Sequence, residues 1–230
     1  MQTTVLSWNI AECNPSSEST WDRKENVRRI EQLIAEKDAD VLSIQEVPTH
    51  DWFQETNLCE TYNLVGNVST HCGFTMILVK SCMQARCLEI RGAPAIGAIV
   101  DGVAYVAMHL APFKINSEVR LEQMRTILAS IPPSVDKMVI VGDTNMRKTE
   151  NAAFECLGIV DAWREVGEDK NTEYTWDSRI NRYHSDGYPF TSRFDRAYMK
   201  GLSCRSFGLI ANEKSDGAYL SDHFGILFTF

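Results

Sequence analysis

The chain lacks the cysteine arrangements that build disulfide frameworks or structural zinc sites. Its seven cysteines are an odd number, and no two of them are spaced as Cys-x-x-Cys. An odd count leaves at least one thiol outside any set of paired disulfides, and zinc ribbons need closely spaced thiols. The sequence therefore predicts reduced thiols inside the cell, in the nucleus, the cytoplasm or both.

A secretory leader and a long apolar run are also lacking. The residues 1–4 show neither the basic region nor the cleavage signature of a signal peptide. The longest nearly apolar stretch, 93–113, is interrupted by Asp101-Gly102. Such a dipeptide is typical of a tight turn between two strands, so we expect a hairpin here and no contact with a membrane.

Positive charge is scarce, with 23 Lys and Arg against 31 Asp and Glu and a formal net charge of −8. Phosphate contacts need local positive charge, so this balance argues mildly against a nucleic-acid ligand. A metal enzyme nevertheless gathers carboxylates at its site, and the bound cation reverses the local field. An acidic average is therefore compatible with a small basic groove.

No repeat, low-complexity tract or long linker divides the 230 residues, and we predict a single domain, 1–230. Apolar residues at helical spacing predict a helix through Val27, Ile30, Leu33 and Ile34 and another over 116–130. Strands are predicted at 4–9, 41–46, 62–65, 74–79, 95–109 (the hairpin), 138–141, 194–199, 204–209 and 224–230. This order favours an α/β architecture of two packed sheets flanked by helices.

Polar side chains stand where several of the predicted strands end. They are Asn9, Glu46, His109, Asp143 with Asn145, Asp195, and the tripeptide Ser221-Asp222-His223. Taken singly, each has an ordinary explanation, because strand-end Asn and Asp are mostly turn formers. Gathered at one end of a sandwich, they would form a site for a hard cation such as Mg²⁺, which prefers oxygen ligands.

The order of these motifs resembles the motif set of the endonuclease/exonuclease/phosphatase superfamily. The matching stretches are Ser7-Trp8-Asn9, Gln45-Glu46, His109-Leu110, Gly142-Asp143-Thr144-Asn145, Phe194-Asp195-Arg196 and Ser221-Asp222-His223. They run from the first strand to the last and so cover nearly the whole chain. The resemblance implies a four-layer αββα sandwich with two mostly antiparallel sheets, and a metal-dependent phosphodiesterase.

Three stretches narrow the resemblance to the 5′-tyrosyl-DNA phosphodiesterase branch: 142–147, 174–177 and 193–196. AP endonucleases of the exonuclease III type usually carry Arg-Ile-Asp-Tyr at the third, and inositol phosphatases and sphingomyelinases lack the Tyr-Thr-Trp-Asp of the second. The branch implies repair of DNA 5′ ends that carry tyrosyl or peptide adducts, such as trapped topoisomerase, with protein-linked RNA as another substrate. We expect a bare catalytic domain, without the ubiquitin-binding extension of some members, acting as a monomer.

The resemblance also implies which residues hold the metal and activate water. Glu46 is the chief ligand of Mg²⁺, with Mn²⁺ as an alternative, and Asn9 and Asp222 lie near the cation or bind it through water. The cation then offsets charge on the phosphoryl group. Asp143, helped by Asn145, orients and deprotonates the attacking water.

Asn9 and several further residues are implied to contact the substrate. His223 donates to a phosphate oxygen with its tautomer fixed by Asp195, and His109 stands on the other side of the phosphate. Arg147 grips a phosphate through its planar guanidinium. Trp176 either stacks on a base or is a packing residue, and the two interpretations are about equally weighted.

Several alternatives stay open at this point. Packing is favoured for Phe194, and Arg179, Arg182 and Lys148 form either a basic patch or an ordinary solvated face. The same fold also serves general or abasic-site DNA nucleases and small-molecule phosphatases. A catalytically silent binding module is disfavoured, because the full set of ligand and base residues is present.

Overall fold

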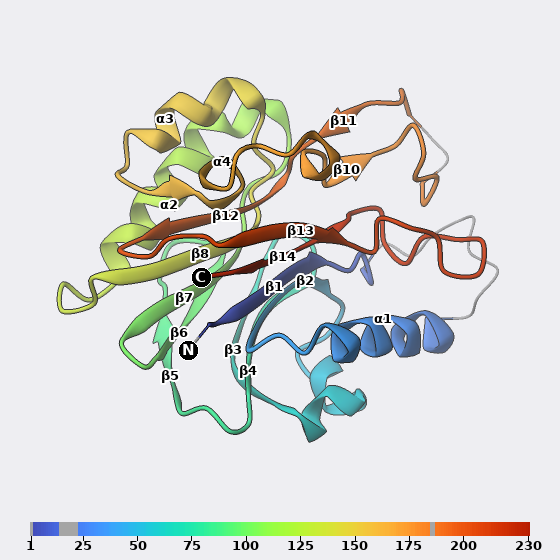
Figure 1. The fold of residues 1–230 in the computed structure, drawn as a ribbon, viewed down its shortest axis with the longest axis horizontal. Coiled ribbons are helices and arrows are strands. Elements are labelled where there is room, and N and C mark those ends of the chain that lie inside the picture. The colour runs from blue at the N-terminus through green and yellow to red at the C-terminus, as the bar shows by residue number, and fades with distance from the viewer. Residues whose placement is uncertain (1, 14–22, 185–186) are drawn as a thin grey trace.

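The computed structural model describes residues 2–13, 23–184 and 187–230, in which two six-stranded sheets lie face to face (Figure 1). The first sheet has the spatial order β13 (Ser206–Ile210), β14 (Gly225–Thr229), β1 (Thr4–Asn9), β2 (Val41–Val47), β4 (Phe74–Lys80) and β3 (Tyr62–Ser69). Its neighbours pair antiparallel except β1 and β2, which are parallel.

The second sheet repeats this arrangement, with one parallel pair formed by β7 and β8. Its order is β5 (Ala85–Glu89), β6 (Ala95–Val100), β7 (Val103–His109), β8 (Lys137–Asp143), β12 (Asp195–Lys200) and β9 (Val160–Asp161). A small ribbon of β10 (Trp176–Asp177) and β11 (Thr191–Ser192) stands apart from both sheets.

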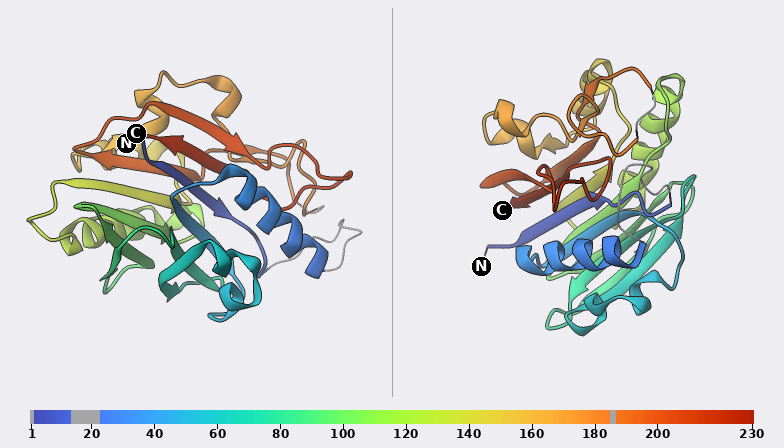
Figure 2. Two further views of the ribbon diagram at one scale, coloured as in Figure 1. Left: turned by 60° about the horizontal axis from the view of Figure 1, so that its bottom comes forward. Right: turned by 90° about the vertical axis from the view of Figure 1, so that its right-hand side faces the viewer.

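Helices cover the outer faces of both sheets (Figure 2). They are α1 (Arg23–Lys37), α2 (Ser117–Ser130), α3 (Asn151–Glu155) and α4 (Ala162–Glu165). Short 3₁₀ segments are η1 (Trp52–Glu55), η2 (Asn57–Glu60), η3 (Lys114–Asn116), η4 (Lys148–Glu150) and η5 (Lys170–Thr172). Among the described residues, none of the helices combines the length and apolarity that crossing a bilayer requires.

Three hydrophobic clusters show that the molecule has four layers. One cluster joins α1 to the first sheet, through side chains such as Ile30, Ile34 and Leu42. A second lies between the sheets, and a third packs α2 and α3 on the second sheet. Each fully buried aliphatic side chain contributes about 1.5–3 kcal/mol. The predicted αββα sandwich with mostly antiparallel sheets is confirmed.

Side chains alternate between the two faces of each strand, so one strand contributes to two hydrophobic clusters. In β1, Val5 faces the core between the sheets, whereas Leu6 faces α1. The same alternation holds for Val41 and Leu42 of β2, because successive side chains of a strand point to opposite faces. Strands buried on both faces read as continuous apolar runs, and this is why they were recognisable in the sequence.

Strand pairing brings the predicted site residues to one edge of the sandwich. Across β7, β8 and β12 the register sets His109 beside Asp143 and Asp143 beside Asp195. Across β1 and β2 it sets Asn9 beside Gln45, one residue before Glu46. Parallel neighbours end at the same edge, so each parallel pair presents two strand ends together.

Gly142 makes this packing possible just before Asp143. Its φ is +148°, and a Cβ there would lie 2.0 Å from the carbonyl oxygen of Met108 on the neighbouring strand. Any side chain would therefore push β7 and β8 apart at the point where they carry His109 and Asp143. The glycine thus fixes the spacing of these two site residues.

Candidate active site

Glu46 is presented by an irregularity in β2 rather than by regular strand geometry. The pairing of β2 with β4 shifts register between Ile44 and Val47, and Glu46 has a φ of +56°. A bulge of this kind re-aims a side chain, and a left-handed conformation costs a non-glycine residue about 1–3 kcal/mol. Asn145 is also left-handed, with a φ of +52°. Such strain gathers at functional sites.

Asn9 connects the two sheets at the site. Its side-chain Nδ2 donates to Glu46 Oε1 at 3.0 Å and to Asp143 Oδ2 at 3.2 Å. Its Oδ1 accepts the backbone N–H of Ala11 at 3.1 Å, which fixes the orientation of the amide. Asn9 is fully buried, and its single amide nitrogen binds both carboxylates.

Asp143 is the centre of the hydrogen-bond network. Besides Asn9, its Oδ1 accepts the backbone N–H of Asn145 at 2.8 Å. Its Oδ2 lies 3.5 Å from His109 Nε2 and 3.7 Å from His223 Nε2. Although burial acts to raise it, the two imidazoles and the Asn145 N–H hold the pKa of Asp143 below its ordinary value. The buried side chain is therefore a carboxylate at neutral pH.

The two histidines differ in charge. Burial lowers the pKa of His109 even though the Asp143 carboxylate opposes this, so His109 is neutral at neutral pH. Burial acts in the same direction on His223, but the Asp195 and Asp143 carboxylates outweigh it and hold the pKa of His223 well above its ordinary value. His223 is thus a cationic donor, and His109 is a neutral imidazole.

Asp195 is hydrogen-bonded to the His223 imidazole. Its Oδ2 lies 2.7 Å from His223 Nδ1, which leaves Nε2 directed toward Asp143. Thr175 holds the backbone around Asp195, because its hydroxyl accepts the N–H groups of Phe194 and Asp195 at 3.1 and 3.0 Å. The Trp8 indole N–H fixes the His223 carbonyl at 3.0 Å. His223 is therefore held both at its ring and at its backbone.

Asp222 lies beside this network and is linked to it by the Ser221 hydroxyl. The Ser221 hydroxyl lies 2.6 Å from the Asn9 carbonyl oxygen and 3.4 Å from Asp222 Oδ1. Asp222 Oδ2 is 3.2 Å from His184 Nε2. His184 was missed in the sequence, because a histidine in a loop carries no pattern that distinguishes it.

The donor set around Glu46 fits a hard divalent cation. Within the described ranges no Lys or Arg is ion-paired with Glu46, whose Oε2 faces only the weakly donating Cys72 thiol at 3.4 Å. Glu46 would hold Mg²⁺ or Mn²⁺ through its carboxylate oxygens, with Asn9 fixing its orientation. Asp222, the other predicted carboxylate ligand, contacts His184 and Ser221. Asp143, Asp195 and His223 form a compact group, with potential ligand atoms within 4.8 Å of one another. There, however, His223 Nδ1 is already engaged by Asp195.

Trp176 contacts the site directly. Its ring packs edge-on against His223, with the ring centres 5.1 Å apart, and stacks on Phe190 at 5.8 Å. Phe194 completes this aromatic cluster at 5.9 Å from Trp176 and is buried, as its packing interpretation predicted. Because Phe190 is 44% exposed, the cluster presents an aromatic surface beside the His223 imidazole.

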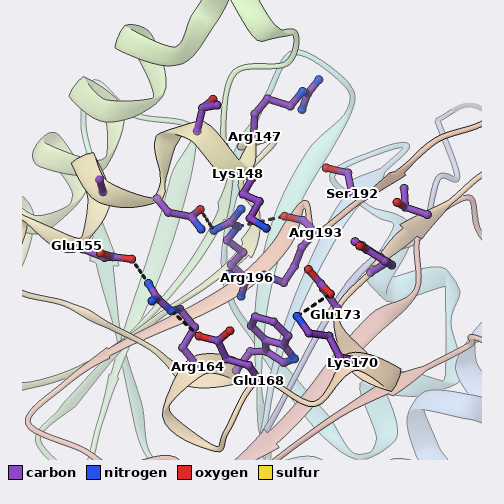
Figure 3. A pocket seen from close by; sticks show the side chains of 16 residues that line it. Arg147, Lys148, Glu155, Arg164, Glu168, Lys170, Glu173, Ser192, Arg193 and Arg196 are labelled. Carbon is purple, nitrogen blue, oxygen red and sulfur yellow. Dashed lines mark hydrogen bonds and ion pairs between the residues drawn. The ribbon is translucent and has the colours of Figure 1, made fainter.

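Arg147 lies between this aromatic cluster and the network. Its guanidinium stands 4.5 Å over the Phe194 ring and donates to the Asn145 carbonyl at 2.7 Å. It also lines a cavity of about 600 Å³ (Figure 3). Around this cavity are the basic residues Arg147, Lys148, Arg164, Lys170, Arg193 and Arg196 and the acidic residues Glu155, Glu168 and Glu173.

Part of this positive charge is neutralised within the protein. Arg164 reaches Glu155 and Glu168, and Lys170 reaches Glu173, as Figure 3 shows. Arg147 and Lys148 have no ion-pair partner among the described residues, so they carry the free charge of the cavity. A basic patch and a solvated face were both open for Lys148, Arg179 and Arg182, and of these three Lys148 lines the cavity. Arg179 is engaged by Asp177 at 2.6 Å.

Comparison with known proteins agrees with this geometry. The Endonuclease/Exonuclease/phosphatase family matches residues 6–223. Tyrosyl-DNA phosphodiesterase 2 (TDP2) of Xenopus laevis is 29% identical over 99% of this chain and 66% of its own length. The Danio rerio protein is 34% identical over 53% of the chain and 36% of its own length. The chain thus spans between about one third and two thirds of these relatives.

Solved structures extend the similarity to the whole fold. A crystal structure of D. rerio TDP2 complexed with single strand DNA product has a TM-score of 0.80 at 25% identity, covering 99% of this chain and 98% of that one. Truncated Caenorhabditis elegans TDP2 has a TM-score of 0.78 at 23% identity, covering 100% and 98%. Because the family model matches residues 6–223, nearly the whole chain, this protein belongs to the endonuclease/exonuclease/phosphatase family.

Proposed function

We propose that this chain is a Mg²⁺-dependent phosphodiesterase that hydrolyses 5′-phosphotyrosyl bonds between DNA and a protein adduct, in DNA repair. The observation that carries the proposal is the network around Asp143, in which a buried carboxylate lies between a neutral and a cationic imidazole. The TDP2 relatives supply the substrate class. When bound at Glu46, a divalent cation would polarise a phosphoryl oxygen.

Asp143 is suited to orient and deprotonate water. It is ionised, and the Asn145 N–H and the Asn9 amide fix both of its oxygens. A carboxylate fixed in this way is ready to accept a proton without rearranging at the moment of reaction. The water proton passes to Asp143 as the water oxygen attacks phosphorus.

His223 and His109 are suited to receive the phosphate from two sides. His223 Nε2 carries a proton that it donates to a non-bridging oxygen, while Asp195 retains the imidazole orientation. His109 Nδ1 is buried and has no hydrogen-bond partner among the described residues. The leaving group is a tyrosine phenolate, whose conjugate acid has a pKa of about 10. It therefore needs little help from a general acid.

The substrate strand would lie between the aromatic cluster and the basic cavity. Phe190 and Trp176 offer a surface on which a base stacks, and Arg147 and Lys148 offer charge to the phosphodiester backbone. Recognition by stacking and backbone charge tolerates any sequence. This matches a substrate defined by its adduct rather than by its bases.

The test is a comparison of two DNA substrates by the purified chain. A 5′-phosphotyrosyl oligonucleotide should be converted to a 5′-phosphate in the presence of Mg²⁺, and EDTA should abolish the reaction. A duplex with an abasic site serves as the control substrate and should be cut far more slowly. Preferential cleavage of the abasic duplex would replace this proposal with that of an abasic-site nuclease.

Two aromatic substitutions distinguish stacking of a DNA base from packing against the His223 imidazole. Phe190→Ala should lower kcat/KM on the oligonucleotide by roughly 5-fold to 150-fold, the usual value of one stacked base. It should leave hydrolysis of bis(4-nitrophenyl) phosphate, which has no base, nearly unchanged. Trp176→Ala should slow both substrates, because it also removes the ring packed against His223. Equal losses for Phe190→Ala on the two substrates would contradict base stacking at this surface.

A further inference from the structure

Two cysteine thiols meet beside Glu46, from segments far apart in the sequence. Cys13 follows β1, and its thiol donates to the Glu46 carbonyl oxygen at 3.3 Å. Cys72 lies in the turn between β3 and β4, and its thiol donates to Glu46 Oε2 at 3.4 Å. The two thiols are also in hydrogen-bonding range of each other. One glutamate thus organises both sulfur atoms.

The packing at Gly73 shows how closely the two segments approach. A Cβ on Gly73 would lie 2.2 Å from Cys13 Sγ, so the Cys13 sulfur sits directly against the backbone that follows Cys72. Only glycine, here with a φ of +60°, allows this approach. A disulfide needs its Cα atoms within about 4.4–6.8 Å. A sulfur packed against the backbone next to its partner is consistent with that requirement.

Both thiols are half-buried and therefore reachable by a small oxidant. Cys82 and Cys156 are exposed and so are also accessible, but neither has a thiol partner among the described residues. A thiol that stands next to a second thiol can pass its oxidised form on to a disulfide. The pair Cys13 and Cys72 is thus the place where oxidation gives a stable reversible product.

We propose that Cys13 and Cys72 are a redox modification site, in which a peroxide converts the two thiols to a disulfide. This disulfide crosslinks the two segments that contact Glu46. In the first step the sulfur of one cysteine attacks hydrogen peroxide, breaks the O–O bond and releases water, which leaves a sulfenic acid. The second thiol then attacks this sulfur, forms the S–S bond and releases a second water. The two thiols lose two electrons, which reduce the peroxide.

The disulfide changes the surroundings of Glu46 in two ways. It removes the S–H donor from Glu46 Oε2, and it ties the β3–β4 turn to the segment after β1. The neighbouring His71 packs edge-on against His109, with ring centres 4.1 Å apart. A shift of Cys72 is therefore transmitted to an imidazole that contacts Asp143. Oxidation should lower turnover by roughly 10-fold or more, the usual effect of disturbing the partners of a metal ligand.

The experiment treats the full chain with hydrogen peroxide, alkylates the remaining thiols and maps the digested protein by mass spectrometry without reduction. The expected result is a peptide pair linked through Cys13 and Cys72, two hydrogens lighter than the sum of its parts and absent after dithiothreitol. Cys13→Ser and Cys72→Ser should lack this pair, and Cys82→Ser, a matched change at an exposed cysteine, should retain it.

The crosslink and its effect on turnover are measured separately. The expected loss of activity rests on the proposed hydrolase function, whereas the crosslink does not, so the two can fail independently. Turnover of the oxidised wild type should return on reduction, and Cys13→Ser should keep its own rate after peroxide. Full alkylation of both Cys13 and Cys72 after peroxide treatment would overturn the proposal, as would linkage of either residue to a different cysteine.

Discussion

Glu46→Ala is expected to reduce turnover by at least about 10²–10³, the usual cost of removing one group that stabilises transition-state charge. The side chain lies on a bulge at the end of β2 and faces Asn9 and Cys72 rather than the hydrophobic core. Its removal should therefore leave the fold intact. The loss should instead appear as weaker binding of Mg²⁺ or Mn²⁺.

The measurement combines kcat, a thermal unfolding curve and titration with Mn²⁺. Glu36→Ala is a matched control, because Glu36 is an exposed glutamate on α1 and remote from the site. It should change neither the rate nor metal binding. A Glu46→Ala protein that turns over at the wild-type rate would refute the assignment of Glu46 as the metal ligand, and so would wild-type activity that survives EDTA.

Asp143→Asn is expected to slow the chemical step by roughly 10²–10⁴, the usual contribution of a general base. The substitution keeps the shape of the side chain but removes the proton acceptor. It also removes the negative charge that faces His109 and His223. Substrate binding should persist, because the phosphate contacts assigned to the histidines and Arg147 remain in place.

Single-turnover kinetics on the 5′-phosphotyrosyl oligonucleotide isolate this step from product release. Asp136→Asn, at an exposed position before β8, is the matched control and should behave as the wild type. The thermal stability of Asp143→Asn should be measured alongside, because the residue is buried within a hydrogen-bond network. Unchanged single-turnover rates in a folded Asp143→Asn protein would reject Asp143 as the base.

The strands with apolar runs were predictable, and the exposed elements were not. β4, β7 and β8 are buried on both faces, so their sequences are mostly apolar. β1 and β2 are buried as well, but their apolar runs are interrupted by the buried polar residues Ser7 and Ser43. The strand β5 was missed, because four of its five residues are exposed and it reads as Ala-Arg-Cys-Leu-Glu. The helices α3 and α4 were also missed, since five and four residues are too few to show a helical period.

The sequence by itself determined the fold class and the identities of the residues at the strand ends, because the order of the motifs is a property of the chain alone. The tertiary structure decided how these residues meet. Asn9, Glu46 and Asp143 come from three strands in two sheets, and only sheet packing makes one amide touch both carboxylates. The meeting of Cys13 with Cys72 likewise depends on contacts between remote segments, which no local pattern encodes.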